Sequence, residues 1–588
     1  MRLSASRRLK LKDDGVKGWL GLCLAVIVAI ALGVMATTPP TPLPQNAPLF
    51  SFSATRAMSD VRRVASVPHA TGTAENAAVR AYLVERLRGL GLELRTVEAD
   101  LPRLAVDRMA GWSKGAHVPA KLVNIVGVLP GKDRSLPAVA LMTHHDTVWG
   151  SPGAADDTAG VATILETVRA VRVSGQPARD LFVVITDAEE LGLMGAKEFF
   201  ANDPLRWRVG TIINLEARGG GGRATMFETS PGNGNAMRLF ADSVRHPGAT
   251  SLATYVYSLL PNDTDLSVSL RGGWPGYNFA FIGRPGLYHS PKATPDNLDQ
   301  GALQDMGAQV LALTRGLLSS GALPERSSDV VFFDVFGLFL LLYPPWLGWL
   351  MLAASVAGLG LVWSKERDLR AAASGMARMF ALLAGSCAIL FALNIASGAG
   401  PQANYYDRLA AIPKLEAMAG FAVAGVFLLL FGHAVMKQAQ LAGAALLFAL
   451  LGIAVQAAAP TAAYVVVVPV LLGALAITLT GKGAATRALA LACTAPVLGY
   501  MIYLGHAVMQ GVGASMPMAA ALPAALAGLA LLPVWPGLAK QVALRNGIAL
   551  LGLALATALW VRLDPVADTV AVYSSDKNVE AIPITKPH

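Results

Sequence analysis

The chain has 588 residues, of which 54% are hydrophobic and only 15% are charged, with a formal net charge of +9 at pH 7. Soluble globular proteins carry about 25% charged residues, so this composition indicates a large membrane-embedded fraction and excludes a simple soluble enzyme. Residues 37–330 nevertheless hold 28 Lys and Arg and 28 Asp and Glu, which excludes a transporter without an extramembrane domain. The three cysteines, Cys23, Cys387 and Cys493, lie in apolar runs, so that segment contains neither a disulfide nor a cysteine nucleophile.

The N-terminal region predicts a membrane anchor. Residues 1–18 form a basic tail, and residues 19–36 are an uncharged apolar run long enough to cross a hydrocarbon core of about 30 Å. Val34 and Ala36 would suit a signal peptidase, but the run exceeds the ~7–15 residues of a signal-peptide core, so we expect a retained transmembrane anchor. The proline-rich residues 37–50 predict a stiff linker to a separate domain.

Residues 51–330 predict an α/β domain with a mixed, largely parallel sheet flanked by helices, because apolar β-branched runs alternate with helical patterns. The expected strands are 122–128, 138–142, 181–186, 211–215 and 277–282. The expected helices include 158–172, 191–201, 235–245 and 301–318. Polar residues cluster where these strands end, and open α/β sheets bind their ligands at that edge.

Two polar clusters follow the second of these strands. His144 and Asp146 lie on one side of an extended chain, so the carboxylate can orient an imidazole that binds metal. A loop of small residues then brings Asp156 and Asp157 to the start of a helix. Asp157 could simply cap that helix, whereas capping does not account for Asp156.

Three further clusters follow later strands. Glu189 and Glu190 could share one site, with one carboxylate binding metal and the other transferring a proton. Glu216 precedes a run of glycines at a strand exit, and Tyr288 and His289 follow the last strand. A lone acid or loop histidine is more often structural. Together, two histidines and several acids form a hard N/O ligand set, which suits paired zinc ions better than a thiolate site does.

Residues 331–563 predict an all-α transmembrane bundle of eight spans. The apolar runs lie near 336–362, 376–396, 417–436, 441–459, 462–480, 488–509, 516–539 and 546–561. With the anchor this makes nine spans, so the two termini would lie on opposite sides. If the N-terminus is cytoplasmic, the cytoplasmic segments hold 15 Lys and Arg and the short outer segments hold 5, in agreement with the positive-inside rule.

This orientation puts residues 51–330 and the C-terminal tail, 564–588, outside the cytoplasm, and we expect the periplasmic face of a bacterial inner membrane. The surplus basic charge then faces anionic lipid, so we expect the lipid bilayer as a partner and no nucleic acid. Among residues in the spans, His433 and His506 lie near predicted span ends and are interpreted as interfacial side chains rather than a proton relay. The sequence therefore indicates no ion or substrate pathway.

The five clusters resemble the motifs of the co-catalytic di-zinc peptidases, the M28-type aminopeptidases. The matching motifs are H-x-D at 144–146, G-x-x-D-D at 153–157, A-E-E-L-G at 188–192, N-L-E at 214–216 and Y-H at 288–289. P-N-D-T-D at 261–265 and F-D at 333–334 resemble the nine-span endoplasmic reticulum metallopeptidase group most. The resemblance covers residues 51–318 and, in the membrane half, only the number of spans.

The resemblance implies two zinc ions per chain, bridged by Asp156. One ion would also bind His144 and Glu216, and the other would bind Glu190 and His289. The α/β fold would then be that of the zinc exopeptidases.

The resemblance also implies roles around the metal ligands. Glu189 would be the general base, Asp146 would orient His144, and Tyr288 would donate a hydrogen bond to the tetrahedral oxyanion. The peptide bond between Asp156 and Asp157 would be cis. His145 breaks the H-x-D spacing, so we expect it to be structural.

The leading hypothesis is a membrane-anchored zinc metallopeptidase, an aminopeptidase acting on peptide or protein substrates. Secreted aminopeptidases of this family often have Asp in place of Glu216, where the carboxylate also helps to hold the substrate's free amine, so exopeptidase specificity stays open. One alternative is a glutaminyl cyclase-like zinc acyltransferase, which uses a single zinc. Another is a non-enzymatic receptor or transporter built on a peptidase fold. The substrate sequence, the native metal, the oligomeric state and the role of the many spans are not predicted.

Overall fold

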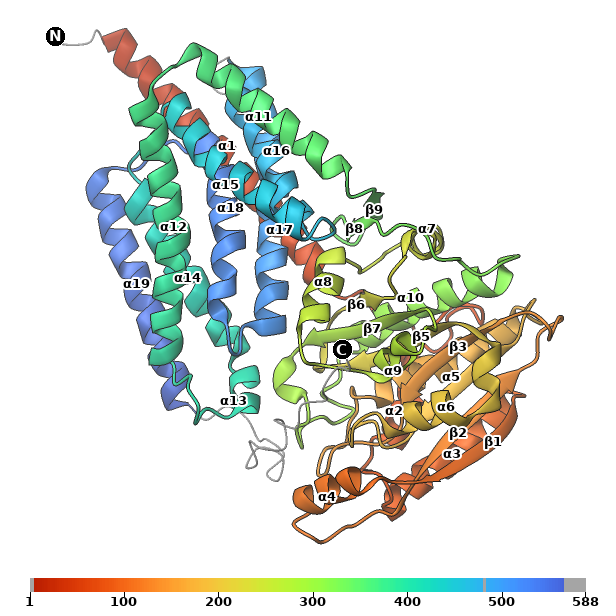
Figure 1. Cartoon of the computed structure of the whole chain (residues 1–588). Helices are drawn as coiled ribbons and strands as arrows, with labels where there is room; N and C mark the ends of the chain where they lie inside the picture. The colour runs from red at the N-terminus through yellow and green to blue at the C-terminus, as the bar shows by residue number, and fades with distance from the viewer. Residues whose placement is uncertain (1–4, 480–482, 565–588) are drawn as a thin grey trace. The chain divides into compact units, whose positions relative to one another are not determined.

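The computed structural model describes residues 5–479 and 483–564, and the chain divides into two compact units. An α/β unit contains Thr38–Leu342 and Asn404–Ala410, and a helical unit contains the other described residues (Figure 1). The predicted C-terminal tail, 564–588, lies outside the described residues except for Asp564. The chain returns briefly to the α/β unit at Asn404–Ala410, a segment that was predicted as part of the transmembrane bundle.

The α/β unit is built on a seven-stranded sheet with the order β1-β2-β4-β3-β5-β7-β6. Its strands are β1 (Glu93–Asp100), β2 (Lys121–Leu129), β3 (Ala138–His144), β4 (Leu181–Thr186), β5 (Val209–Ala217), β6 (Gly221–Thr229) and β7 (Gly276–Gly283). The four inner strands β4, β3, β5 and β7 run parallel to one another, while β1, β2 and β6 pair antiparallel with their neighbours. The prediction of a mixed, largely parallel sheet is confirmed.

Helices cover both faces of this sheet. The helices of the unit are α2 (Ala54–Val64), α3 (Ala74–Gly89), α4 (Arg103–Trp112), α5 (Thr158–Val173), α6 (Met194–Asn202), α7 (Gly234–Ser243), α8 (Ser251–Leu259), α9 (Asp265–Arg271), α10 (Gln300–Ser319) and α13 (Tyr405–Ala410). Residues of β3 alternate between the two faces: Leu141 packs in one core with α5 and α10, and Met142 packs in the other with Phe199 of α6. Because the inner strands are buried on both faces, most of their residues are apolar, and polar residues such as His144 and Glu216 stand near their carboxyl ends.

The unit extends beyond the boundary predicted at residue 330. Two short strands, β8 (Val331–Asp334) and β9 (Leu340–Tyr343), form a small sheet, and residues up to 342 belong to the α/β unit. A turn through Phe336 and Gly337, both with positive φ, separates the two strands. The apolar run expected to begin a span at 336 therefore begins in this turn and continues as β9, and the following helix starts only at Leu347.

The helical unit contains the predicted spans. Its helices are α1 (Ala5–Thr37), α11 (Leu347–Lys365), α12 (Leu369–Ala396), α14 (Ile412–Phe431), α15 (Gln438–Ala458), α16 (Tyr464–Leu479), α17 (Ala484–Val512), α18 (Ala521–Leu531) and α19 (Lys540–Leu563). In the described residues, eight helical segments are long and apolar enough to cross a membrane, and α16 is a shorter apolar helix of 16 residues. At 1.5 Å per residue, α16 is about 24 Å long, so the predicted count of nine spans depends on this helix.

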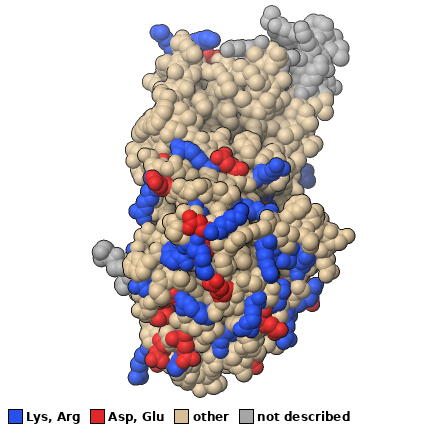
Figure 2. Space-filling view, turned by 90° about the vertical axis from the view of Figure 1, so that its right-hand side faces the viewer, with Lys and Arg blue, Asp and Glu red and all other residues tan. Residues whose placement is uncertain are grey.

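The surfaces of the two units differ in charge. On the face drawn in Figure 2, Lys, Arg, Asp and Glu side chains gather on the α/β unit, while much of the surface of the helical unit carries none. Exposed apolar side chains such as Leu350, Phe380 and Leu553 lie on its helices. An uncharged apolar surface is what hydrocarbon requires of a spanning helix.

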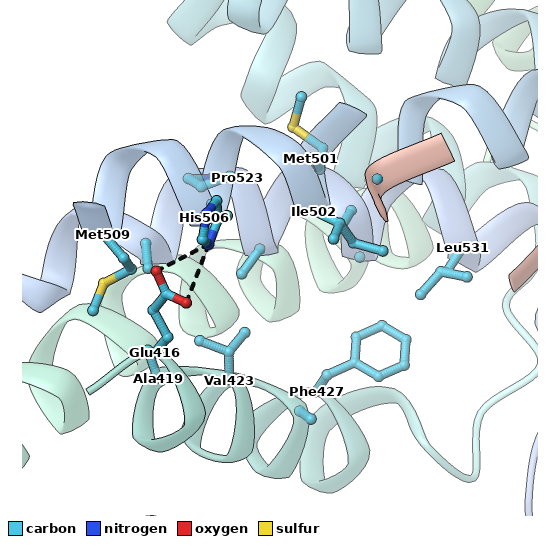
Figure 3. Close-up of a pocket in the computed structure, with 18 of the residues that line it drawn as sticks. Glu416, Ala419, Val423, Phe427, Met501, Ile502, His506, Met509, Pro523 and Leu531 are labelled. Atoms are coloured by element: carbon cyan, nitrogen blue, oxygen red, sulfur yellow. Dashed lines mark hydrogen bonds and ion pairs between the residues drawn. The ribbon is translucent and has the colours of Figure 1, made fainter. Parts of the chain in front are cut away.

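The helical unit holds a cavity of about 720 Å³ between α1, α14, α17 and α18. Apolar side chains such as Val423, Phe427 and Ile502 line it, and Glu416 and His506 pair at one end with a nitrogen–oxygen distance of 3.1 Å (Figure 3). Gln510 donates a hydrogen bond to Glu416 over 2.7 Å. Glu416 was missed in the sequence because the span was expected to begin at 417, whereas α14 begins five residues earlier.

Candidate metal centre

The predicted site residues come together at one edge of the sheet. Because β3, β4, β5 and β7 are parallel, their carboxyl ends lie along the same edge. His144 is the last residue of β3, Glu216 lies next to the last residue of β5, and His289 follows β7. Glu189 and Glu190 follow β4. The loop after β3 brings Asp156 to the same place.

Asp156 lies between two groups of possible metal ligands. In the first group, His144 Nε2 lies 3.2 Å from Asp156 Oδ1 and 3.9 Å from Glu216 Oε2. In the second, His289 Nε2 lies 3.1 Å from Asp156 Oδ2 and 3.3 Å from Glu190 Oε2. Within each group all ligand atoms lie within 4.8 Å of one another. The two oxygens of Asp156 therefore face different groups, as a bridging carboxylate would.

The donor atoms fit a divalent cation in each group. Glu190 Oε1 and Glu216 Oε1 are buried and have no hydrogen-bond partner among the described residues. Burial raises the pKa of both carboxyl groups, and the charge of Asp156 raises the pKa of each further. Buried carboxylates that repel one another and lack partners require a nearby positive charge. Imidazole nitrogens and carboxylate oxygens are ligands that zinc accepts.

The surrounding carboxylates raise the pKa of both imidazoles, His144 and His289. Burial alone lowers the pKa of His289, but Glu190 and Asp156 raise it to about 9. Burial likewise works against protonation of His144, but hydrogen bonds with Asp146 and Asp156 raise its pKa well above its usual value. The carboxylates around both imidazoles therefore favour positive charge at this centre.

Glu189 belongs to neither ligand group and lies beside them. Its Oε2 is 4.0 Å from His144 Nε2, and its side chain is 12% exposed. Burial raises the pKa of Glu189 well above its usual value, and the nearby carboxylates of Glu216 and Glu190 raise it further. A carboxylate of this kind is suited to accept a proton near neutral pH.

Asp146 connects the first histidine to the loop that carries the two glutamates. Its carboxylate accepts hydrogen bonds from the backbone N–H of Glu189 at 3.0 Å and of Glu190 at 3.3 Å. The same carboxylate lies 3.4 Å from His144 Nδ1, and the Asp146 carbonyl oxygen lies 3.0 Å from that nitrogen. Asp146 thus contacts the imidazole of His144 and the backbone of both glutamates.

Asp157 and His145 have structural contacts. Asp157 caps α5 by accepting a hydrogen bond from the N–H of Gly160, and it also accepts one from the Thr143 hydroxyl. The peptide bond between Asp156 and Asp157 is cis. The two ring nitrogens of His145 lie 3.2 Å from the Asn76 amide and 3.2 Å from the Val123 carbonyl oxygen. Both nitrogens of His145 therefore have partners away from the two ligand groups.

The structure adds two residues to the site that the sequence analysis did not select. Asp265, the first residue of α9, is buried and accepts a hydrogen bond from Thr186, and burial raises its pKa to about 6. The hydroxyl of Tyr257 on α8 is buried without a hydrogen-bond partner in the described part of the chain. Burial and the nearby charges of Glu228 and Glu216 raise the pKa of Tyr257 well above its usual value. For Asp265, the P-N-D-T-D motif was an available signal.

Two tyrosines lie against His289. The ring of Tyr288 stacks on His289 with centroids 3.7 Å apart, and the hydroxyl of Tyr406 on α13 lies 3.1 Å from His289 Nδ1. Tyr288 was predicted as a site residue from its position next to His289. Tyr406 is 117 residues away in the chain and carries no motif, so no sequence signal indicates it.

Comparisons with known proteins agree with the motifs. Residues 124–314 match the model of Peptidase family M28. Endoplasmic reticulum metallopeptidase 1 of Homo sapiens is 29% identical over 332 residues, which are 54% of this chain and 36% of that protein. A vacuolar membrane protease of Yarrowia lipolytica is 27% identical, over 55% of this chain and 34% of that protein. The chain thus spans little more than a third of the length of these relatives.

Among solved structures, the aminopeptidase from Aneurinibacillus sp. strain AM-1 matches 48% of this chain and 98% of its own, with a TM-score of 0.37 and 15% identity. The match to the family model covers the end of every parallel strand from β3 to β7 and stops within α10. The resemblance seen in the motifs is therefore confirmed: residues 124–314 of this chain match Peptidase family M28, and the chain is similar to endoplasmic reticulum metallopeptidase 1 and to the vacuolar membrane proteases.

Proposed function

We propose that this protein is a membrane-anchored zinc metallopeptidase that hydrolyses peptide bonds outside the cytoplasm. The observation that carries the proposal is the pair of histidine–carboxylate groups that share Asp156 beside Glu189. His144, Asp156 and Glu216 would hold one zinc ion, and Asp156, Glu190 and His289 would hold the other. When bound, two zinc ions acidify a shared water and polarise the scissile carbonyl group.

Glu189 is the general base of this proposal. It accepts the proton that the attacking water loses and returns it to the leaving amine, a role that contributes about 10²–10⁴-fold to the rate of such reactions. Its position supports this role, because it lies 4.0 Å from the ligand His144 and belongs to neither ligand group. Asp146 holds the loop that carries both glutamates, because its carboxylate accepts a hydrogen bond from the backbone N–H of Glu189 and of Glu190.

The tetrahedral oxyanion needs a hydrogen-bond donor, and two tyrosines are candidates. Tyr288 lies against His289, and Tyr257 has a buried hydroxyl whose pKa responds to Glu216 and Glu189. We assign the donation to Tyr288 and a supporting contact with the substrate to Tyr257. A hydroxyl without a partner is available to a substrate, since leaving it unpaired is otherwise costly.

The substrate is a peptide or a protein, and the expected activity is that of an aminopeptidase. The buried carboxylates of Glu216 and Asp265 would attract a free N-terminal ammonium group. A glutaminyl cyclase-like reaction with one zinc would leave one of the two ligand groups without a purpose, so hydrolysis is the better supported reaction.

The membrane topology is part of the proposal. With nine spans and a cytoplasmic N-terminus, the α/β unit and the end of the chain share the outer side. A reporter that requires an oxidising, non-cytoplasmic compartment should be active when fused after His588 and silent when fused at Lys482. If the fusion after His588 behaves as cytoplasmic while the α/β unit is outside, the number of spans is even, and α16 is the first helix to re-examine.

The activity is tested by digesting a peptide library with the full-length protein in detergent and reading the products by mass spectrometry. The proposal expects cleavage that a zinc chelator abolishes and added zinc restores. The products also distinguish three activities. An aminopeptidase removes single residues from N-termini, an endopeptidase cuts inside the peptide, and a glutaminyl cyclase converts an N-terminal glutamine to its cyclic form. Products that persist in a Glu189→Gln variant would come from a contaminating peptidase, and a lack of zinc-dependent products would contradict the proposal.

A further inference from the structure

One segment of the α/β unit lies, in chain order, between two helices of the helical unit. The residues from Asn404 to Ala410 follow α12 and precede α14, yet they belong to the α/β unit. Within this segment α13 packs against the short helix η2 (Pro285–Leu287), directly before Tyr288 and His289. The insertion therefore lies beside the loop that carries one of the proposed zinc ligands.

The segment is closely packed in the α/β unit. Leu409 is fully buried, and Tyr406 is only 5% exposed. A Cβ atom on Gly286 would lie 2.7 Å from Ala410 Cα, so only glycine allows α13 to approach η2 this closely. Arg218, two residues after Glu216, donates a hydrogen bond to the hydroxyl of Tyr405. The insertion thus contacts two of the chain segments that carry the proposed ligands.

The positions of the two ring nitrogens of His289 indicate how the insertion affects this histidine. Its Nε2 faces the carboxylates of Asp156 and Glu190 at 3.1 and 3.3 Å, so Nε2 is the ligand atom. Its Nδ1 faces the hydroxyl oxygen of Tyr406 at 3.1 Å. A neutral imidazole that binds metal through Nε2 carries its proton on Nδ1. In that state His289 donates a hydrogen bond to Tyr406, and this bond fixes both the tautomer and the ring orientation.

The other proposed histidine ligand has an equivalent support. His144 Nδ1 faces the carbonyl oxygen and the carboxylate of Asp146, two residues away in the same strand–loop segment. At the corresponding nitrogen of His289, the contact comes from another part of the chain, the hydroxyl of Tyr406 in the insertion. The two histidines are therefore oriented by different parts of the chain.

We propose that Tyr406 is a positioning residue that holds His289 for zinc, so that the insertion between α12 and α14 completes the metal centre. This inference rests on the proposed function in so far as His289 is a zinc ligand. It assigns a purpose to one part of the chain outside the M28 match, which ends at residue 314. Outer partners of metal-bound histidines typically contribute about 10–100-fold to metal affinity or activity.

The test measures zinc binding rather than catalysis. The full-length protein is stripped of metal in detergent, and zinc is titrated in competition with a chromophoric chelator. Tyr406→Phe removes only one hydroxyl, so the ring contacts with Tyr288 and His289 stay. We expect Tyr406→Phe to weaken one zinc-binding step about 10-fold and to leave the other step unchanged. Cobalt substitution should show an altered visible absorption spectrum for the same site.

Tyr405→Phe is the matched control, because it removes a hydroxyl from the same segment that contacts Arg218 rather than a ligand. It should bind zinc as the wild type does. If Tyr405→Phe weakens zinc as much as Tyr406→Phe does, the segment acts through packing alone and the inference is wrong. Wild-type zinc affinity and an unchanged cobalt spectrum in Tyr406→Phe would overturn it as well.

His289→Ala distinguishes a failure of this inference from a failure of the proposed function. If His289→Ala loses a zinc ion and Tyr406→Phe binds zinc normally, the ligand assignment stands and the role of Tyr406 falls. If His289→Ala retains both zinc ions, His289 is not a ligand, and both the assignment and the inference fail. If His289→Ala loses a zinc ion and Tyr406→Phe only weakens zinc binding, both the assignment of His289 as a ligand and the role of Tyr406 are supported.

Discussion

The two units of this protein use ionisable side chains in opposite ways. The α/β unit gathers two histidines and three further carboxylates around Asp156 at the end of a parallel sheet. In the cavity of the helical unit, the ionisable lining residues are Glu416 and His506, which contact each other over 3.1 Å among apolar side chains (Figure 3). Charge is costly in a membrane, so a spanning unit keeps it paired, whereas a sheet edge can hold unpaired carboxylates for a metal. The residues that could hold a metal therefore lie in the α/β unit.

The largest effect is expected for a metal ligand. Glu190→Gln removes the charge that faces His289 at 3.3 Å, so it should lower both the zinc content and the rate of peptide hydrolysis. Atomic absorption on the purified variant measures the metal, and turnover of a cleaved library peptide measures the rate. A Glu190→Gln variant that keeps full zinc content would mean that Glu190 is not a ligand and that the roles of the adjacent glutamates need to be exchanged.

A smaller effect is expected for Asp146→Asn. The amide preserves the size of the side chain, but it brings N–H donors toward the N–H groups of Glu189 and Glu190 and removes the charge beside His144. Activity or zinc affinity should fall by about 10–100-fold, as for other partners of metal-bound histidines. Steady-state kinetics at saturating zinc separates the loss of metal from the loss of orientation. Unchanged kinetics and unchanged zinc affinity would show that the backbone carbonyl alone orients His144.

The smallest effect is expected in the helical unit. Glu416→Gln breaks the ion pair with His506 but changes none of the hydrogen bonds described for the metal centre. Peptide hydrolysis and zinc content should equal those of the wild type within the error of the assays. A clear loss of activity in Glu416→Gln would contradict the separation of the two units and would make the cavity part of the catalytic function.

The parts of the fold that were predictable from sequence are those with continuous patterns. The strand expected at 181–186 has the same bounds as β4, because a buried inner strand is an uninterrupted apolar β-branched run. The edge strands β1 and β6 were not predicted. β1 is rich in polar residues and has no buried residue, and β6 begins with two glycines and an arginine, so neither forms an apolar run. Residues 336–343 were assigned to the start of a span, because strands and helices are indistinguishable in short apolar runs, whereas 340–343 form β9.

The residues of the candidate site were likewise predictable only where they stand in a sequence motif. His144, Asp156 and Glu190 stand in short motifs at strand ends, so their chain spacing already indicates that they meet. Tyr257 and Tyr406 lie in helices without a motif, and only the packing of α8 and α13 brings them to the site. Contacts that depend on tertiary structure alone leave no local pattern to read.

The account is tested most directly by measuring zinc content and peptide hydrolysis side by side in the wild type and in Glu189→Gln. The central claim separates two neighbouring glutamates, one that transfers a proton and one that binds metal. We expect both proteins to hold two zinc ions per chain and the variant to hydrolyse peptides about 10²–10⁴-fold more slowly, because only the general base is lost. Loss of zinc from Glu189→Gln, or hydrolysis at the wild-type rate, would contradict the account.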